Sequence, residues 1–224
     1  MHVLAWVLVW MLVSVVPGWA FPSTPILDTF TGADNTTPPN ANWTNAVITG
    51  ASSANVHIRS NGITNTTTAG GDAYWNVTQF NADQEVYADI TDVAVGKWVS
   101  VHGRLANIGA NTTDGYMVYS DDALSEVYIS RRDNGTYVQL GAAISQAVAV
   151  GDKIGMKLVG DQICAWYYDA SGSATWVELG CRTDATYTSG GYIGISVDST
   201  DTTTAIADNF GGGNVASEGA VRRR

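Results

Sequence analysis

The sequence is poor in charged residues, and above all in basic ones. Asp, Glu, Lys and Arg make up 14% of the 224 residues, and 11 basic residues face 21 acidic ones, for a formal net charge of −10. Three of the basic residues are Arg222, Arg223 and Arg224 at the C-terminal end, so the remainder is more acidic still. A nucleic-acid-binding surface needs cations that neutralise phosphates, so this composition argues against a nucleic-acid partner.

Helical periodicity is also missing. No long segment repeats apolar residues at helical spacing, and short alternating runs recur instead, separated by Gly, Asn and Asp. Asn134-Gly135 and Gly160-Asp161 each predict a two-residue hairpin turn between such runs. This pattern predicts an all-β protein, a sandwich or a barrel. The runs are 85–91, 97–106, 115–120, 126–131, 136–140, 153–160, 163–169, 175–179 and 191–199.

Long apolar stretches are absent except at the N-terminus. Residues 3–16 are apolar apart from Ser14, and Gly18-Trp19-Ala20 then places small residues at the two positions that a signal peptidase reads. We therefore predict a signal peptide over 1–20, a secreted domain over 21–213 and a flexible basic tail over 214–224. The alternative for the leader is an uncleaved membrane anchor, which is the only contact with a membrane that we expect.

Cysteine is scarce, and its two positions are informative. Cys164 and Cys181 flank the loop 170–174, and pairing Asp169 with Trp176 would place the two cysteines opposite each other. A secreted protein permits the resulting cross-strand disulfide, which would stabilise the fold by roughly 3 kcal/mol. Two separate buried thiols are the alternative. A zinc site is poorly supported, because beyond the leader the chain has only two histidines and it has no Cys-x-x-Cys.

The strand at 163–168 has two apolar faces. A two-residue turn at Gly160-Asp161 groups one face with residues 154, 156 and 158, whereas the disulfide register groups the other with residues 177 and 179. A one-residue bulge at Gln162 would also reconcile the two registers. We expect the first face, Ile163, Ala165 and Tyr167, to lie in the core. Trp166 and Tyr168 would then face outward or onto a concave sheet.

The order of several segments resembles the concanavalin A-like lectin/glucanase superfamily, and more narrowly the laminin-G-like jelly rolls of secreted bacterial proteins and phage virion proteins. The resemblance spans Leu27 to Gly213 and implies a jelly-roll β-sandwich of two antiparallel sheets, one convex and one concave. The segments are "ILDTFTGAD", "NWTNAV", "EVYADIT", "GDKIGMKLVGDQICAWYYD", "TSGGYIGISVDS" and "IADNFGGG".

The resemblance also implies that the first and last strands, "ILDTF" and "IADNF", lie side by side where the sandwich closes. We expect Phe30 and Phe210 to anchor the core, and Asp28 and Asp208 to cap the turns that follow. The alternative is a structural calcium site, which relatives of this fold often carry. Its candidate ligands are Asp28, Asp34 and Asp208.

Glucanases of this superfamily carry Glu-x-Asp-x-x-Glu on one strand. The nearest stretch here is "DQEVYADI", in which Asp83, Glu85 and Asp89 share one face but Ala88 stands where the third acid is required. We therefore expect no glucanase activity and read these acids as solvent-facing. A polysaccharide lyase is a more distant alternative, for which His102 and Arg104 would share a face of their strand.

Aromatic residues are plentiful enough to form a sugar-binding surface, because sugar rings stack their C–H faces on aromatic rings. We predict a secreted, non-catalytic carbohydrate-binding module that binds a polysaccharide or glycan for adhesion or targeting. The alternatives are a structural or host-attachment domain of a virion or cell surface, packing against copies of itself, and, less favoured, a polysaccharide-degrading enzyme. The candidate binding residues are Trp98, Tyr116, Trp166, Tyr168, and the pair Tyr74 and Trp75 in the loop-like stretch 70–78.

Overall fold

The computed structural model describes residues 20–49, 55–65, 70–121, 123, 125–198 and 205–215. The predicted signal peptide, except Ala20, and nearly all of the predicted basic tail lie outside these residues. The described part of the chain forms sixteen strands. None of its segments forms a helix of the length and apolarity that a membrane crossing requires.

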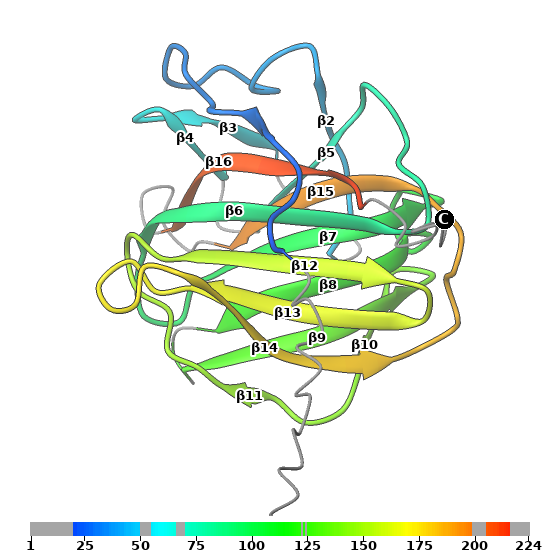
Figure 1. Ribbon diagram of the computed structural model, residues 1–224. Helices are drawn as coiled ribbons and strands as arrows, with labels where there is room; N and C mark the ends of the chain where they lie inside the picture. Colours follow the sequence, from blue (N-terminus) through cyan, green and yellow to red (C-terminus); the bar gives the residue numbers. More distant parts are fainter. Residues whose placement is uncertain are drawn as a thin grey trace, which may run out of the picture.

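The strands form two eight-stranded sheets, which lie one in front of the other in Figure 1. This confirms the predicted all-β sandwich of antiparallel sheets. Sheet A has the order β14 (Trp176–Thr183), β13 (Gln162–Tyr168), β12 (Lys153–Val159), β6 (Gln84–Val93), β16 (Ala205–Asn214), β4 (Gly62–Asn65) and β3 (Val56–Arg59), with β1 (Ile26–Asp28) beside β16. Sheet B has the order β10 (Thr136–Gln139), β9 (Glu126–Asp133), β8 (Asp114–Asp121), β7 (Trp98–Ala106), β15 (Tyr192–Asp198), β5 (Gly71–Trp75) and β2 (Trp43–Asn45), with β11 (Ile144–Ser145) beside β9.

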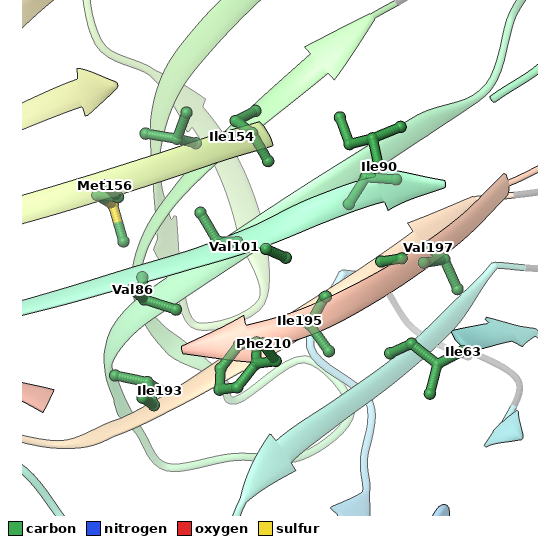
Figure 2. Close-up of a cluster of buried hydrophobic side chains, with 14 of the residues drawn as sticks. Ile63, Val86, Ile90, Val101, Ile154, Met156, Ile193, Ile195, Val197 and Phe210 are labelled. Atoms are coloured by element: carbon green, nitrogen blue, oxygen red, sulfur yellow. The ribbon is translucent and has the colours of Figure 1, made fainter. Parts of the chain in front are cut away.

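Strand alternation fills the space between the two sheets. Every second residue of a strand points inward, so each strand contributes a row of apolar side chains to one shared core. Figure 2 shows part of this core, in which strands of both sheets direct their side chains toward each other. The labelled residues are Ile63, Val86, Ile90, Val101, Ile154, Met156, Ile193, Ile195, Val197 and Phe210.

Both predicted hairpin turns are present. Asp133 pairs with Thr136 across Asn134-Gly135, and both turn residues have positive φ, at 48° and 76°. Asn and Gly tolerate this left-handed backbone, which matches the twist of the flanking strands. The second turn joins β12 to β13, where residue 159 pairs with residue 162 across Gly160-Asp161.

The disulfide between Cys164 and Cys181 is confirmed, but the register next to it differs from our expectation. Trp166 pairs with Glu178 rather than with Leu179, and the register shifts between Ala165 and Trp166. Leu179 is the extra, unpaired residue of a bulge in β14, and this bulge brings the two cysteines opposite each other. No bulge occurs at Gln162, because β12 and β13 pair without a shift. The expected core face is confirmed, with residues 163, 165 and 167 buried.

The first and last strands do lie side by side. Asp28 of β1 pairs with Phe210 of β16, and both Phe30 and Phe210 are fully buried against Trp43, at ring-centroid distances of 5.3 and 4.9 Å. The Asp28 carboxylate accepts the backbone N–H of Phe30 at 2.8 Å, and the Asp208 carboxylate accepts that of Asn209 at 2.6 Å. The two similar phrases therefore form the seam of the sandwich.

Candidate functional site

Two of the six predicted aromatic binding residues belong to the core. The stretch around Tyr74 and Trp75 is strand β5 rather than a loop, and alternation sends Trp75 inward onto Trp43, with ring centroids 5.7 Å apart. Tyr116 is fully buried and donates its hydroxyl to Asp184 at 2.7 Å. The expectation of exposed rings at Trp75 and Tyr116 is therefore wrong, since neither ring has a face left for a ligand.

Tyr74 points the other way, out of sheet B. Its ring is half-buried against Tyr192, with centroids 4.9 Å apart. One side of the ring is thus occupied by the protein itself.

Trp166 and Tyr168 lie on the outer face of sheet A, where the N-terminal strap, residues 20–25, crosses the strands. Figure 1 shows this segment in dark blue passing in front of β16 and β6 toward β12. Phe21 of the strap stacks on Trp166 at 4.8 Å and meets Trp176 edge-on, also at 4.8 Å. A Cβ on Gly155 would lie 2.4 Å from the Phe21 ring, so this glycine leaves the space that the ring fills. The strap occupies the ring face of Trp166 that a sugar would need.

The side chains of Glu85 and Asp89 in β6, and that of Asp83 just before it, form hydrogen bonds or ion pairs within the protein. Glu85 is fully buried, and one of its oxygens accepts the backbone N–H of Thr24 in the strap at 2.7 Å. Asp89 forms an ion pair with Lys153 at 2.7 Å, and Asp83 accepts the backbone N–H of Gly160. The expectation of solvent-facing acids is wrong for Glu85, because the strap covers this part of the sheet. The open pair of carboxyl groups that most glycosidases use is therefore not formed by these residues.

His102 and Arg104 do not share a face. The His102 Nε2 atom lies 2.9 Å from the Ser100 hydroxyl and 2.7 Å from that of Ser196, and burial lowers the pKa of His102 to about 3. Arg104 has a φ of +49°, and this backbone irregularity turns its guanidinium away, to the carbonyls of residues 82, 160 and 187. The predicted pairing of these two residues is wrong for this reason.

The three candidate calcium ligands do not converge. The Asp28 carboxylate is occupied by Phe30 N–H, Asn40 Nδ2 and Trp43 Nε1, and Asp34 accepts the backbone N–H of Ser60 at 2.9 Å. Among the described residues, the one group of three potential ligands is Cys164, Glu178 and Cys181, and its two cysteines form the disulfide. Calcium needs six to eight oxygens. The residues around Asp28, Asp34 and Asp208 thus do not fit a calcium ion.

A pocket of about 260 Å³ opens on the outer face of sheet B. We call it the sheet B pocket. Four neighbouring strands build it, and residues two apart on β8 share this face because side chains alternate. Its lining comprises Trp98 from β7, Met117, Tyr119 and Asp121 from β8, Arg132 from β9 and Tyr137 from β10.

The aromatic rings around this pocket hold one another in place. Tyr119 stacks on Tyr128 with centroids 4.7 Å apart and an interplanar angle of 5°. Trp98 and Tyr137 meet the Tyr119 ring edge-on, at 6.2 and 6.0 Å, and the hydroxyls of Tyr119 and Tyr137 lie 3.0 Å apart. Burial and the Tyr137 hydroxyl raise the pKa of Tyr119 far above its usual value. The pocket therefore has a preorganised aromatic wall.

Of these lining residues, the sequence singled out Trp98 only. A usable signal for two others is the run "GYMVYS", whose alternation places Met117 and Tyr119 on the face opposite the buried Tyr116. The predicted Asn134-Gly135 turn already places Arg132 opposite Tyr137. Their place beside Met117 and Tyr119 depends on the pairing of β9 with β8.

No protein-family model and no curated protein matches the chain, but solved structures do. The carbohydrate binding module CBM66 from Bacillus subtilis matches at 17% identity and a TM-score of 0.55, over 78% of this chain and 93% of that one. The exoplasmic/lumenal domain of VIP36, bound to Ca2+ and Man3GlcNAc, matches at 12% identity and a TM-score of 0.55, over 84% and 90%. A xylan beta-1,4-xylosidase from Bacillus halodurans matches at 13% identity and a TM-score of 0.52, over 88% of this chain and 40% of that one.

These likenesses show the fold. They confirm the two-sheet antiparallel β-sandwich that the resemblance to the concanavalin A-like lectin/glucanase superfamily implied. Because a carbohydrate binding module, a glycan-bound lumenal domain and part of an enzyme all share it, the fold does not decide between binding and catalysis.

Proposed function

We propose that this chain, with its concanavalin A-like sandwich, is a secreted, non-catalytic carbohydrate-binding module that binds its glycan in the sheet B pocket. The observation that carries the proposal is the preorganised aromatic wall of that pocket, next to two charged side chains, Asp121 and Arg132. The carbohydrate binding module and the Man3GlcNAc-bound VIP36 domain among the structural matches support the same class of function.

The chemistry of the pocket suits a sugar. The rings of Trp98 and Tyr137 offer flat apolar surface for the C–H faces of a sugar ring, and their own contacts limit the entropy lost on binding. The Asp121 carboxylate can accept hydrogen bonds from sugar hydroxyls. The volume lies just below the roughly 300–1,000 Å³ of pockets for drug-sized ligands, which suits one or two units of a longer glycan.

The side chains that line the sheet B pocket favour binding of a sugar over its hydrolysis. Asp121 is the single carboxylate that lines this pocket, whereas most glycosidases use two that flank the scissile bond. Asp83, Glu85 and Asp89, the acids nearest to the glucanase pattern, belong to sheet A and its approach. A second carboxylate from the described residues does not reach the pocket lining.

A glycan array, with Trp98→Ala beside the unchanged protein, tests this proposal. We expect Trp98→Ala to weaken glycan binding about tenfold or more, because stacked aromatic contacts contribute roughly 1–3 kcal/mol. Trp166→Ala, on the opposite sheet under the strap, is the matched control and should leave affinity unchanged. A chelator should also have no effect, given that the candidate calcium ligands do not converge.

Three outcomes would contradict the proposal. No binding to any glycan, together with ordered oligomers in solution, would favour the structural or host-attachment domain. Release of reducing or unsaturated ends from a polysaccharide would favour an enzyme. Equal loss of binding in Trp98→Ala and Trp166→Ala would place the site elsewhere.

A further inference from the structure

The arginine in the sheet B pocket is held differently from the buried Arg104 and the half-buried Arg182. Arg104 and Arg182 each direct three guanidinium nitrogens at backbone carbonyls, at 2.6–2.9 Å. Arg132 is 8% exposed, yet its one hydrogen bond to the described residues is a long one, 3.4 Å from Nη1 to the carbonyl of Gly135. Its Nε atom is buried and has no hydrogen-bond partner. Arg132 therefore has guanidinium N–H groups without an acceptor, and burying a cation with unpaired donors costs free energy.

No acidic side chain of the described residues compensates this charge at close range. Their ion pairs within 4.0 Å are made by Arg131 and Lys153. Asp72 attracts Arg132 from farther away, but its oxygens accept the backbone N–H groups of Ile48 and Thr49 and the Thr49 hydroxyl. The guanidinium instead lies over the Tyr137 ring, 5.4 Å from its centroid. This places an unpaired cation at the wall of an aromatic pocket.

We infer that the sheet B pocket selects acidic glycans, and that Arg132 binds the carboxylate of a uronic acid unit. This inference rests on the proposed carbohydrate-binding function and names its ligand class. A guanidinium presents paired donors in one plane, which match the two oxygens of a carboxylate. The same sugar unit carries hydroxyls for Asp121 and a ring face for Trp98, so it uses each kind of group in the lining. Because the chain carries a net charge of −10, a local cation rather than the overall field must provide this selectivity.

The test compares polygalacturonate with its methyl ester, which has the same sugar ring but no charge, by affinity electrophoresis and calorimetry in 0.15 M salt with EDTA. We expect the unchanged protein to bind polygalacturonate or alginate about tenfold more tightly than the neutral ester. Arg132→Gln should remove this preference while retaining binding to the ester. Lys153→Gln removes one positive charge from sheet A and is the matched control. This variant should keep the preference for polygalacturonate over the ester. Circular dichroism and urea unfolding of each variant confirm the fold.

The possible failures are distinguishable. Equal affinity for the acid and the ester, with binding still lost in Trp98→Ala, overturns the inference and leaves the proposed function standing. Arg132-dependent binding of dextran sulfate without binding of either uronate overturns the uronate assignment. Loss of the preference in Lys153→Gln as well shows that overall charge, not Arg132, is responsible. No binding to any of these polysaccharides overturns the inference; the proposed function falls as well only when the glycan array shows no binding either.

Discussion

Replacing Asp28 with Ala should weaken the seam of the sandwich far more than its place at the surface end of β1 suggests. The carboxylate accepts three hydrogen bonds, from Phe30 N–H at 2.8 Å, Asn40 Nδ2 at 2.7 Å and Trp43 Nε1 at 2.7 Å. Trp43 is only 2% exposed, so its indole N–H cannot turn to water when the carboxylate is removed.

The expected loss follows from these contacts. A buried donor left without a partner costs about 1–3 kcal/mol, and the loss of the bond to the Phe30 amide adds about 1 kcal/mol. The Asn40 side chain is exposed and regains water, so it adds little. We therefore expect the free energy of unfolding to fall by about 3 kcal/mol in Asp28→Ala. Asp34→Ala is the control, because the Asp34 carboxylate accepts one exposed backbone N–H, and its loss should stay below about 1 kcal/mol.

A double-mutant cycle isolates the bond between Asp28 and Trp43. Trp43→Phe removes the indole donor but keeps an aromatic ring against Phe30 and Phe210. Urea unfolding followed by fluorescence of the single and double variants should give a coupling energy of about 1–2 kcal/mol at an unchanged m-value. A coupling near zero, or a loss in Asp28→Ala no larger than in Asp34→Ala, would refute the reasoning that this carboxylate holds the seam.

Three further predictions concern the strap, the disulfide and the buried histidine. Phe21→Ala should detach the strap, at a cost of about 2 kcal/mol, and speed proteolysis at the N-terminal end without changing glycan affinity; unchanged proteolysis would contradict the stacking on Trp166. Replacing Cys164 and Cys181 with Ser should lower the free energy of unfolding by about 3 kcal/mol for this 17-residue separation, and the unchanged protein in reductant should match the variant in urea unfolding. Burial lowers the pKa of His102 to about 3, so below pH 6.5 the unfolded chain binds a proton that the folded one does not, and stability falls with acidification. Between pH 7.5 and 5.0 this loss should be about 2 kcal/mol larger in the unchanged protein than in His102→Gln, and equal losses would show that His102 is not held neutral.

Local pattern was enough to predict nine of the sixteen strands of the described residues, whereas the two layers were implied by the resemblance. A period of two residues marks a strand with one buried face wherever it occurs, so the runs along the chain became β6 to β10 and β12 to β15. The two turns and the disulfide followed for the same reason, since each depends on residues close in the sequence. The bulge in β14 escaped prediction, because one extra residue leaves no mark in an alternating pattern.

The site was harder to predict, because exposure depends on what covers a residue. Trp75 and Trp98 look alike in the sequence, yet one packs against Trp43 and the other lines the sheet B pocket. Likewise, Glu85 reads as a solvent-facing acid until the strap crosses it. Such differences arise from segments that are distant in the chain.

The sequence by itself determined the all-β class, the two hairpin turns and the disulfide, because alternation and turn chemistry are local properties. The two-sheet sandwich and the meeting of "ILDTF" with "IADNF" were implied by the resemblance in the order of the segments. Only the tertiary structure decided which aromatic rings are free, which acids are covered, and that Arg132 stands unpaired beside Tyr137. Burial and pairing are properties of neighbours in space, and here those neighbours come from four different strands and from the N-terminal strap.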